Sequence, residues 1–296
     1  MTTAPAAETG TDPFVTHRSL LFTVAYELLG SAADAEDVLQ ESWLRWADVD
    51  PARVRDARAY LIRIVTRQSL NRLRTLSRRR EQYVGEWLPE PLLTSPDVAE
   101  DVELAESVSF AMLTVLETLG PTERAVFVLR EVFELPYEEI AEALGKTPAA
   151  VRQVARRARG HVAARRPRVR VTRSEQERVV ERFLATLRTG RLQDLMEVLA
   201  PDVVLIADGG GIAAALLAPL HGADAVAALL ARAQRAPVAF DTGTLWLNGA
   251  PAGRIDLGGE LSVISLAVAD GLVTRVYIVR NPQKLTRLDV PAALTR

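Results

Sequence analysis

Residues 137–162 most constrain how this chain folds, because they place two short helices around a glycine turn. The segment reads YEEIAEALGKTPAAVRQVARRARGHV, and its turn is Gly145-Lys146-Thr147. Thr147 before Pro148 predicts an N-cap and a first helical position for the second helix. One buried face is expected from Ile140, Leu144, Val151, Val154, Ala155 and Ala158. This pattern is typical of a helix-turn-helix, whose second helix enters the DNA major groove.

The outward face of that second helix carries side chains that can read DNA. Arginine binds guanine O6 and N7 with two hydrogen bonds, and glutamine does the same for adenine. The residues predicted to contact DNA here are Thr147, Arg152, Gln153, Arg156 and Arg157. A plain helical hairpin with a solvated arginine face is the alternative.

Charge along the chain alternates in blocks. Residues 19–50 hold seven acids and one base, whereas residues 51–80 hold ten arginines and one acid. Residues 97–142 are acidic again, and residues 143–173 carry one lysine and nine arginines without an acid. These blocks favour two surfaces that face a polyanion, separated by acidic surfaces that suit a basic partner. Solvated charge runs are the alternative.

Composition excludes several kinds of site. The 296 residues include no cysteine and three histidines, which excludes disulfides and thiolate chemistry and argues against a histidine metal centre. The N-terminal MTTAPAAETGTDP lacks the features of a signal peptide, and the apolar stretch 212–231 is interrupted by Pro219, His221 and Asp224. We therefore expect a cytoplasmic protein with no membrane contact and no cofactor.

The character of the sequence changes near Ser174. Before Ser174 the apolar residues recur with a helical period. Helical segments are expected over 102–118 and over 32–47, and the second should turn Val38, Trp43 and Trp46 inward. After it, helices precede β-like runs separated by glycine turns, beginning with 203–206, as in an α+β domain. The predicted units are 14–80, a linker at 81–101, 102–166, and 174–288. Pro167 is the expected end of the all-α part.

Two further segments, DAEDVLQESWLRW and RAYLIRIVTRQSLNRLR, precede PTERAVFVLREVF and the helix-turn-helix. In this order they resemble an extracytoplasmic-function (ECF) sigma factor of bacterial RNA polymerase. The resemblance implies that the protein binds core polymerase through the β′ clamp helices and the β flap, and promoter DNA through regions 2 and 4. It assigns polymerase contacts to Asp37, Gln40 and Glu41. It assigns −10 element contacts to Tyr60, Arg63, Arg67, Asn71, Arg72 and Arg74, and the −35 element to the helix-turn-helix.

Three motifs narrow the resemblance to the sigma-J-like group, which has a fused SnoaL-like domain of the cone-shaped NTF2-like fold. They are Trp87, Leu88, Pro89, Glu90 and Pro91; Asp208, Gly209, Gly210 and Gly211; and Asn281, Pro282, Lys284 and Leu285. Ile212 and Gln283 stand where the group has lysine and aspartate. The resemblance implies that the fused domain contacts the linker and tunes activity in place of a separate anti-sigma factor.

The residues themselves favour such a contact, because a linker with Trp87, Leu88 and three prolines is apolar enough to dock on another surface. Packing of Trp87 into the helical part is the alternative. Two other functions compete: a helix-turn-helix repressor with a ligand-binding tail, and a SnoaL-like enzyme tethered to DNA. The enzyme's candidate pocket residues are Asp202, Asp208, His221 and Asp256, each of which also fits a turn or cap. We expect no catalysis.

Overall fold

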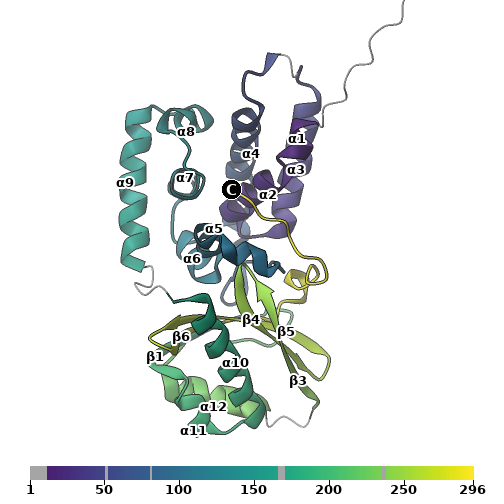
Figure 1. The fold of residues 1–296 in the computed structure, drawn as a ribbon, viewed down its shortest axis with the longest axis vertical. Coiled ribbons are helices and arrows are strands. Elements are labelled where there is room, and N and C mark those ends of the chain that lie inside the picture. The colour runs from purple at the N-terminus through teal and green to yellow at the C-terminus, as the bar shows by residue number, and fades with distance from the viewer. Residues whose placement is uncertain (1–11, 51–52, 81, 166–170, 235–237) are drawn as a thin grey trace, which may run out of the picture.

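The computed structural model describes residues 12–50, 53–80, 82–165, 171–234 and 238–296, with helices above one sheet (Figure 1). Within these ranges no helix is long and apolar enough to cross a membrane. The same ranges contain no group of three or more His, Asp or Glu side chains that could hold a metal ion. Pro167 and the first eleven residues of the predicted non-signal segment lie outside the described residues.

Four helices form the N-terminal bundle: α1 (Pro13–Thr16), α2 (Arg18–Leu29), α3 (Ala32–Ala47) and α4 (Ala57–Arg80). The central α2 is buried from Leu20 to Leu29. It ends at Gly30, whose φ of 67° is a left-handed conformation that suits glycine. A Cβ on Gly30 would also lie 2.7 Å from Trp87 Cη2. Ser31 then starts α3 by accepting a hydrogen bond from Asp34 N at 3.2 Å.

The second helical unit begins with a 3₁₀ turn (Pro96–Glu100) and α5 (Val102–Val108). The helical character predicted over 102–118 is confirmed, but it is divided into two helices, because Ser109 ends α5 and caps α6 (Phe110–Leu116) by accepting from Met112 N. The chain continues through α7 (Pro121–Phe127), a π-helical turn (Val128–Val132), α8 (Tyr137–Leu144) and α9 (Pro148–Arg165).

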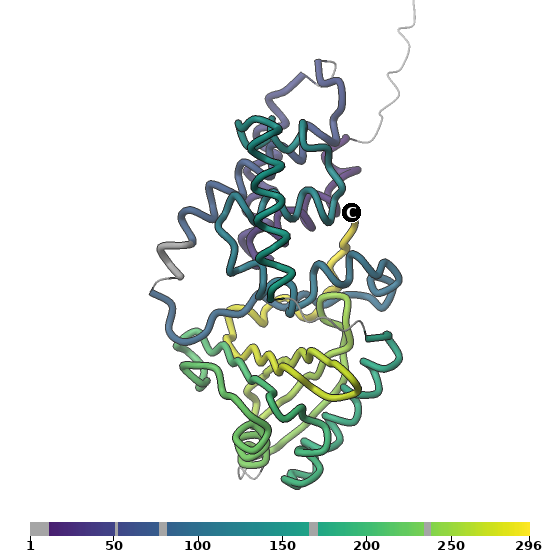
Figure 2. The backbone as a smooth tube through the Cα atoms, turned by 90° about the vertical axis from the view of Figure 1, so that its left-hand side faces the viewer, coloured from purple at the N-terminus to yellow at the C-terminus, as the bar shows by residue number. Residues whose placement is uncertain are grey.

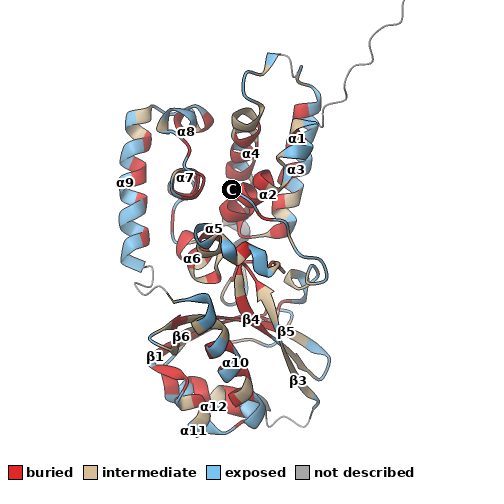
Figure 3. Cartoon of the chain, in the orientation of Figure 1, coloured by how far each residue is buried: buried red, intermediate tan, exposed pale blue. Residues whose placement is uncertain are grey.

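The predicted helix-turn-helix is confirmed at α8 and α9. Gly145 is left-handed with φ 63°, and Thr147 Oγ1 accepts from Ala150 N at 3.2 Å as the N-cap of α9. The buried face of α9 includes Val151, Val154, Ala155 and Ala158, and its opposite side is exposed (Figure 3).

The C-terminal domain packs α10 (Arg173–Thr189), α11 (Leu192–Met196) and α12 (Ala223–Gln234) against a six-stranded sheet. Its strands are β1 (Leu199–Asp208), β2 (Leu220–His221), β3 (Phe240–Leu247), β4 (Ala250–Leu257), β5 (Glu260–Ala269) and β6 (Leu272–Val279). Their order is β2-β1-β6-β5-β4-β3, and only the β1–β6 pair is parallel. The predicted fold class, all-α units followed by an α+β domain, is confirmed.

The two helical units share one hydrophobic core, which joins Leu21 and Leu61 to Val126 and Val151. A second core lies between the sheet and α10–α12. On the opposite face of the sheet, a third cluster brings Leu88 of the linker and Phe110 of α6 against Tyr277 and Val279 of β6. The sheet domain is therefore packed directly on the linker and on α6.

The last residues of the chain return to the helices (Figure 2). After a 3₁₀ turn (Pro282–Lys284), Leu294 enters the helical core with 6% of its surface exposed. Thr295 N donates to Thr23 Oγ1 at 3.1 Å, and Arg296 pairs with Asp101 and Glu103. This C-terminal strap ties α2 to the start of α5 and extends beyond the predicted domain end at 288.

Candidate DNA- and polymerase-binding surfaces

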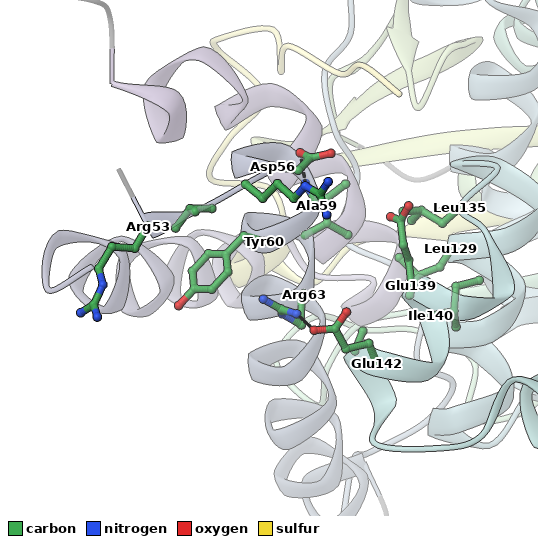
Figure 4. A pocket seen from close by; sticks show the side chains of 14 residues that line it. Arg53, Asp56, Ala59, Tyr60, Arg63, Leu129, Leu135, Glu139, Ile140 and Glu142 are labelled. Carbon is green, nitrogen blue, oxygen red and sulfur yellow. Dashed lines mark hydrogen bonds and ion pairs between the residues drawn. The ribbon is translucent and has the colours of Figure 1, made fainter. Parts of the chain in front are cut away.

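Two of the α4 arginines predicted to contact DNA are bonded to the end of α8. Arg67 donates from Nε to Ala143 O at 3.0 Å and from Nη2 to Glu142 O at 2.9 Å. These carbonyl groups lie in the last turn of α8, where helix carbonyls lack intrahelical donors and the helix dipole favours a cation. Arg63 forms an ion pair with the Glu142 carboxylate (Figure 4).

A cavity of about 320 Å³ separates the rest of this face of α4 from α8. Tyr60 lines this cavity and is half-buried (Figure 4). The centroid of its ring lies 5.9 Å from that of Trp46, and the Arg63 guanidinium lies 4.9 Å from the centroid of the Tyr60 ring. Leu135, Glu139 and Ile140 form the opposite wall. The structure thus pairs Arg63 with the helix-turn-helix, whereas Tyr60 packs against Trp46 and Arg63.

The third α4 arginine pairs with α3. Arg72 Nη2 lies 2.6 Å from Asp34 Oδ1 and 2.6 Å from Asp37 Oδ2. A predicted DNA contact and a predicted polymerase contact are therefore direct neighbours. Asn71 and Arg74 stay on the exposed surface of α4, where Arg74 Nη1 donates to Asn71 Oδ1 at 3.2 Å.

The predicted polymerase face of α3 is exposed at Asp37, Gln40 and Glu41. The expectation that Trp43 points inward is wrong: it is 44% exposed, and Leu44 beside it is 57% exposed. Only the α3 residues that meet α2 and α4, such as Val38 and Trp46, are buried. The result is an acidic surface with a large apolar centre.

On α9 the predicted contacts Arg152, Gln153, Arg156 and Arg157 are all exposed. Arg152 pairs with Glu138 of α8 at 2.9 Å, and Arg157 lies 3.7 Å from Glu123 of α7. Both partners belong to the same helical unit as α9. Exposed pairs of this kind contribute about 0–1 kcal/mol and are readily exchanged for phosphate.

Asp208 joins the linker to the sheet domain. Its carboxylate is 0% exposed and accepts from Tyr83 Oη at 2.6 Å, Leu88 N at 2.8 Å and Lys284 Nζ at 2.7 Å. Burial together with the Asp208 carboxylate raises the pKa of Tyr83 well above its usual value. These three donors to the Asp208 carboxylate come from the linker and the third motif.

Lys284 supplies the cation at this contact. Its Nζ also donates to Leu88 O at 2.5 Å and lies 4.2 Å from the centre of the Trp87 ring. Ile212, directly after the three glycines, is 57% exposed. Gly210 must be glycine here: its φ is 62°, and a Cβ would collide with the side chain of Asn281, which donates to Tyr83 Oη.

The remaining linker motif residues, Leu88, Pro89, Glu90 and Pro91, are buried. Glu90 fastens the linker to the N-terminal bundle: its carboxylate accepts from Ala33 N at 3.2 Å at the start of α3, where the helix dipole favours an anion. Trp87 lies between Gly30 and Lys284, so it contacts the helical part and the sheet domain together. In the third motif Asn281 is buried, Leu285 is half-buried and Pro282 is exposed.

Sequence reasoning missed Asn248, which occupies the β3–β4 turn with φ 53° and 1% exposure. Its Nδ2 donates to Tyr26 Oη at 2.7 Å and to Val108 O at 2.9 Å, and its Oδ1 accepts from Leu92 N at 3.0 Å. The Asn-Gly pair predicts only a hairpin turn. Its role as a tie between the sheet domain, the linker and both helical units depends on tertiary contacts.

A buried charged cluster between α2 and α7 was also missed. Arg124 is 2% exposed, donates from Nε to Glu27 O at 2.9 Å and pairs with Glu117. The Glu27 carboxyl is 0% exposed and accepts from Ser107 Oγ at 2.7 Å. Burial raises the pKa of Glu27 to about 8, so the carboxyl is largely protonated at neutral pH.

The candidate residues for catalysis are not gathered in one pocket. Asp202 and His221 are exposed, and Asp208 is held by the linker. Asp256 accepts from Gly259 N at 2.8 Å in the β4–β5 turn, so it acts as a turn residue.

A helix-turn-helix, a second arginine-bearing helix and a fused α+β domain define a multidomain DNA-binding protein. Comparisons with known proteins narrow this class. The family "Sigma-70 region 2" matches residues 14–79, and "Sigma-70, region 4" matches residues 109–162.

Relatives match nearly the whole chain. It is 37% identical over 284 residues to the ECF RNA polymerase sigma factor SigJ of Mycobacterium tuberculosis H37Rv, covering 91% of both chains. It is 32% identical to the probable ECF RNA polymerase sigma factor SigI of Mycobacterium tuberculosis CDC 1551, covering 92% of this chain and 93% of SigI. The crystal structure of Mycobacterium tuberculosis SigJ superposes with a TM-score of 0.76 at 33% identity, covering 95% of this chain and 99% of that one.

The chain belongs to the family of ECF RNA polymerase sigma factors. Proteins of this family bind core RNA polymerase and promoter DNA to start transcription, and they are not enzymes. The repressor and the tethered enzyme are therefore set aside as alternatives.

Proposed function

We propose that this sigma factor reads the −10 element with α4 and the −35 element with α9, and that its sheet domain tunes both by holding the linker. Asp208 carries this proposal. A fully buried carboxylate bonded by Tyr83, Leu88 and Lys284 is costly to leave unpaired, so the linker is held firmly to β1.

The contacts between α4 and α8 link the position of the linker to DNA binding. Arg63 and Arg67 meet α8 in this arrangement, so they become available to single-stranded DNA only after α8 moves away. The linker connects α4 to α5 and is bonded on both sides, by Glu90 to α3 and by Leu88 to the sheet domain. Release of the linker lets the two helical units separate as promoter binding requires.

In this proposal the exposed face of α3 binds the β′ clamp helices through Asp37, Gln40 and Glu41, and α7–α9 meet the β flap. The large apolar surface of Trp43 and Leu44 at this face suits a protein interface, since exposed aromatic side chains are common at interface centres. The protein acts in the cytoplasm, and the fused domain takes the place of a separate anti-sigma factor.

The test compares Asp208→Ala with Asp202→Ala, an exposed carboxylate on the same strand. Core polymerase affinity and run-off transcription are measured with the full-length proteins. We expect Asp208→Ala to change both by about tenfold or more, the effect of losing a buried charged hydrogen-bond partner. Asp202→Ala should behave as the unaltered protein. Identical transcription by both variants would refute control by the sheet domain.

A further inference from the structure

A second cavity, of about 690 Å³, lies where the helical part meets the sheet domain. One wall comes from α5 and α6 and includes Phe110 and Ala111; the other comes from β3–β5 and includes Ala267 and Val268. Its size falls in the range of small-molecule sites, which also favour domain interfaces. It lies beside the third hydrophobic cluster, where Phe110 of α6 packs against the sheet.

The walls are mostly apolar, but one buried hydroxyl faces the cavity. Ser265 of β5 lines the cavity, and 7% of its surface is exposed. A ligand that covers this hydroxyl must offer it a polar atom, because a buried hydroxyl without a hydrogen bond is costly. Ser265 therefore marks where a polar atom of a ligand would sit.

Hydrogen-bond donors gather at one rim, where α10 begins. The Arg173 guanidinium lies 4.5 Å above the Trp246 ring of β3, and its Nε donates to Glu177 Oε1 at 3.1 Å. Gln176 lines the same rim one turn along α10. The flat face of Trp246 beside a cation suits an aromatic ring that carries an acceptor group.

We propose that this cavity binds a flat, mostly apolar organic molecule with one hydrogen-bond-accepting or anionic group placed toward Ser265 and Arg173. Because its walls come from both sides of the contact, such a ligand binds only while α5 and α6 rest on the sheet. It stabilises this closed arrangement by its binding free energy. Its effect on polymerase binding rests on the proposed function.

Two dyes of the same shape test the site on the full-length protein. 1-Anilinonaphthalene-8-sulfonate carries an anionic acceptor, and N-phenyl-1-naphthylamine lacks it. We expect one sulfonate dye per chain with saturable fluorescence, and binding about tenfold weaker for the neutral dye, the usual difference for a charge-assisted hydrogen bond. Absence of saturable binding by both dyes would overturn the site.

Filling variants locate the dye. Ala111→Phe on α6 and Ala267→Phe on β5 enter the cavity from opposite walls, and each should abolish binding. Ala233→Phe adds the same volume at an exposed position of α12 and should bind as the unaltered protein. Binding that survives either filling variant would overturn a site between the two walls. Thermal unfolding of each variant checks that the chain is folded.

A charge-removing variant and competition with core polymerase complete the test. Arg173→Gln should weaken the sulfonate dye about tenfold and leave the neutral dye unchanged, whereas Arg178→Gln on the same helix should alter neither. Core polymerase should displace the dye, since linkage between two ligands is reciprocal. If the filling variants abolish binding but polymerase does not displace the dye, the site stands and its coupling to the proposed function fails.

Discussion

The helices α4 and α9 carry the same sequence signal, arginines on an exposed helical face, but the tertiary structure treats them differently. The α9 arginines pair with acids of their own helical unit, as Arg152 does with Glu138. Arg63 and Arg67 of α4 instead bond across to α8 of the other unit. A rigid movement of one unit leaves the α9 pairs intact and breaks the α4 contacts. In this arrangement the α9 arginines bond only within their own unit, whereas Arg63 and Arg67 are held by the other unit.

The largest expected effect removes the scaffold that holds the two units together. Arg124→Met removes the buried guanidinium that pairs with Glu117 and donates to the Glu27 carbonyl, which should lower the free energy of unfolding by about 3–5 kcal/mol. Urea denaturation of the full-length chain measures this. Arg130→Met, which removes a half-buried arginine bonded to Leu135 O, should cost about 1 kcal/mol. Equal losses in the two variants would show that the buried cluster does not hold the units together.

The next effect depends on pH. The folded Glu27 carboxyl keeps its proton up to about pH 8, whereas the ordinary value is 4.5, so the folded state binds more protons between these values. The free energy of unfolding should therefore fall as the pH rises from about 4.5 to 8. Glu27→Gln lacks this titration and should match the unaltered protein at pH 4.5 while exceeding its stability by about 4 kcal/mol at pH 9. A constant difference at all pH values would contradict a buried, protonated Glu27.

Duplex binding by the free protein tests the difference between α4 and α9. Arg156→Ala should weaken binding to a duplex carrying the −35 element by about tenfold, because it removes one base or phosphate contact. Arg67→Ala should leave this affinity unchanged, since its guanidinium is bonded to α8. Fluorescence anisotropy with a promoter that the protein transcribes measures both affinities. A comparable loss from Arg67→Ala would mean that α4 is already available in the free chain.

The smallest effect concerns the α4–α8 contact itself. Glu142→Arg places a cation beside Arg63 and should raise the population of separated units about fivefold, as expected for losing an ion pair worth about 1 kcal/mol. The chain has no cysteine, so Thr75→Cys on α4 and Ala149→Cys on α9 allow paired fluorophores for energy transfer. Glu138→Arg, on the α9 side of α8, is the matched control. Equal transfer in both variants would argue that Glu142 does not restrain α8.

Local rules predicted the helix-turn-helix well. The Thr147 cap, the left-handed Gly145 and the buried stripe of α9 depend on neighbours within one or two turns. Local rules failed where contacts between distant segments determine which residues are buried. The apolar period of α3 includes Trp43, yet only the side that meets α2 and α4 is buried. The strand expected over 203–206 begins at Leu199 because β6 pairs with it across an irregularity that accommodates Pro201.

The motifs of the linker and of the C-terminal domain were found from the sequence, but not how they fit together. Lys284, not a residue after the glycines, pairs with Asp208. Asn248 and Glu27 carried no sequence signal of a tie between units, because an Asn-Gly turn and a helical glutamate are common elsewhere. Their roles follow from partners more than 75 residues away in the chain, which no local pattern encodes.

By itself the sequence determined the helical units, the glycine-stopped and side-chain-capped helix ends, the α+β character of the C-terminal domain and the two arginine-rich faces. Each depends on period, capping or charge within a short segment. The tertiary structure alone decided that one arginine-rich face meets α8 and the other meets solvent. The reason is that Arg67 and Arg63 bond to carbonyl groups and a carboxylate at the end of α8, and these groups meet only when the shared core brings both units together.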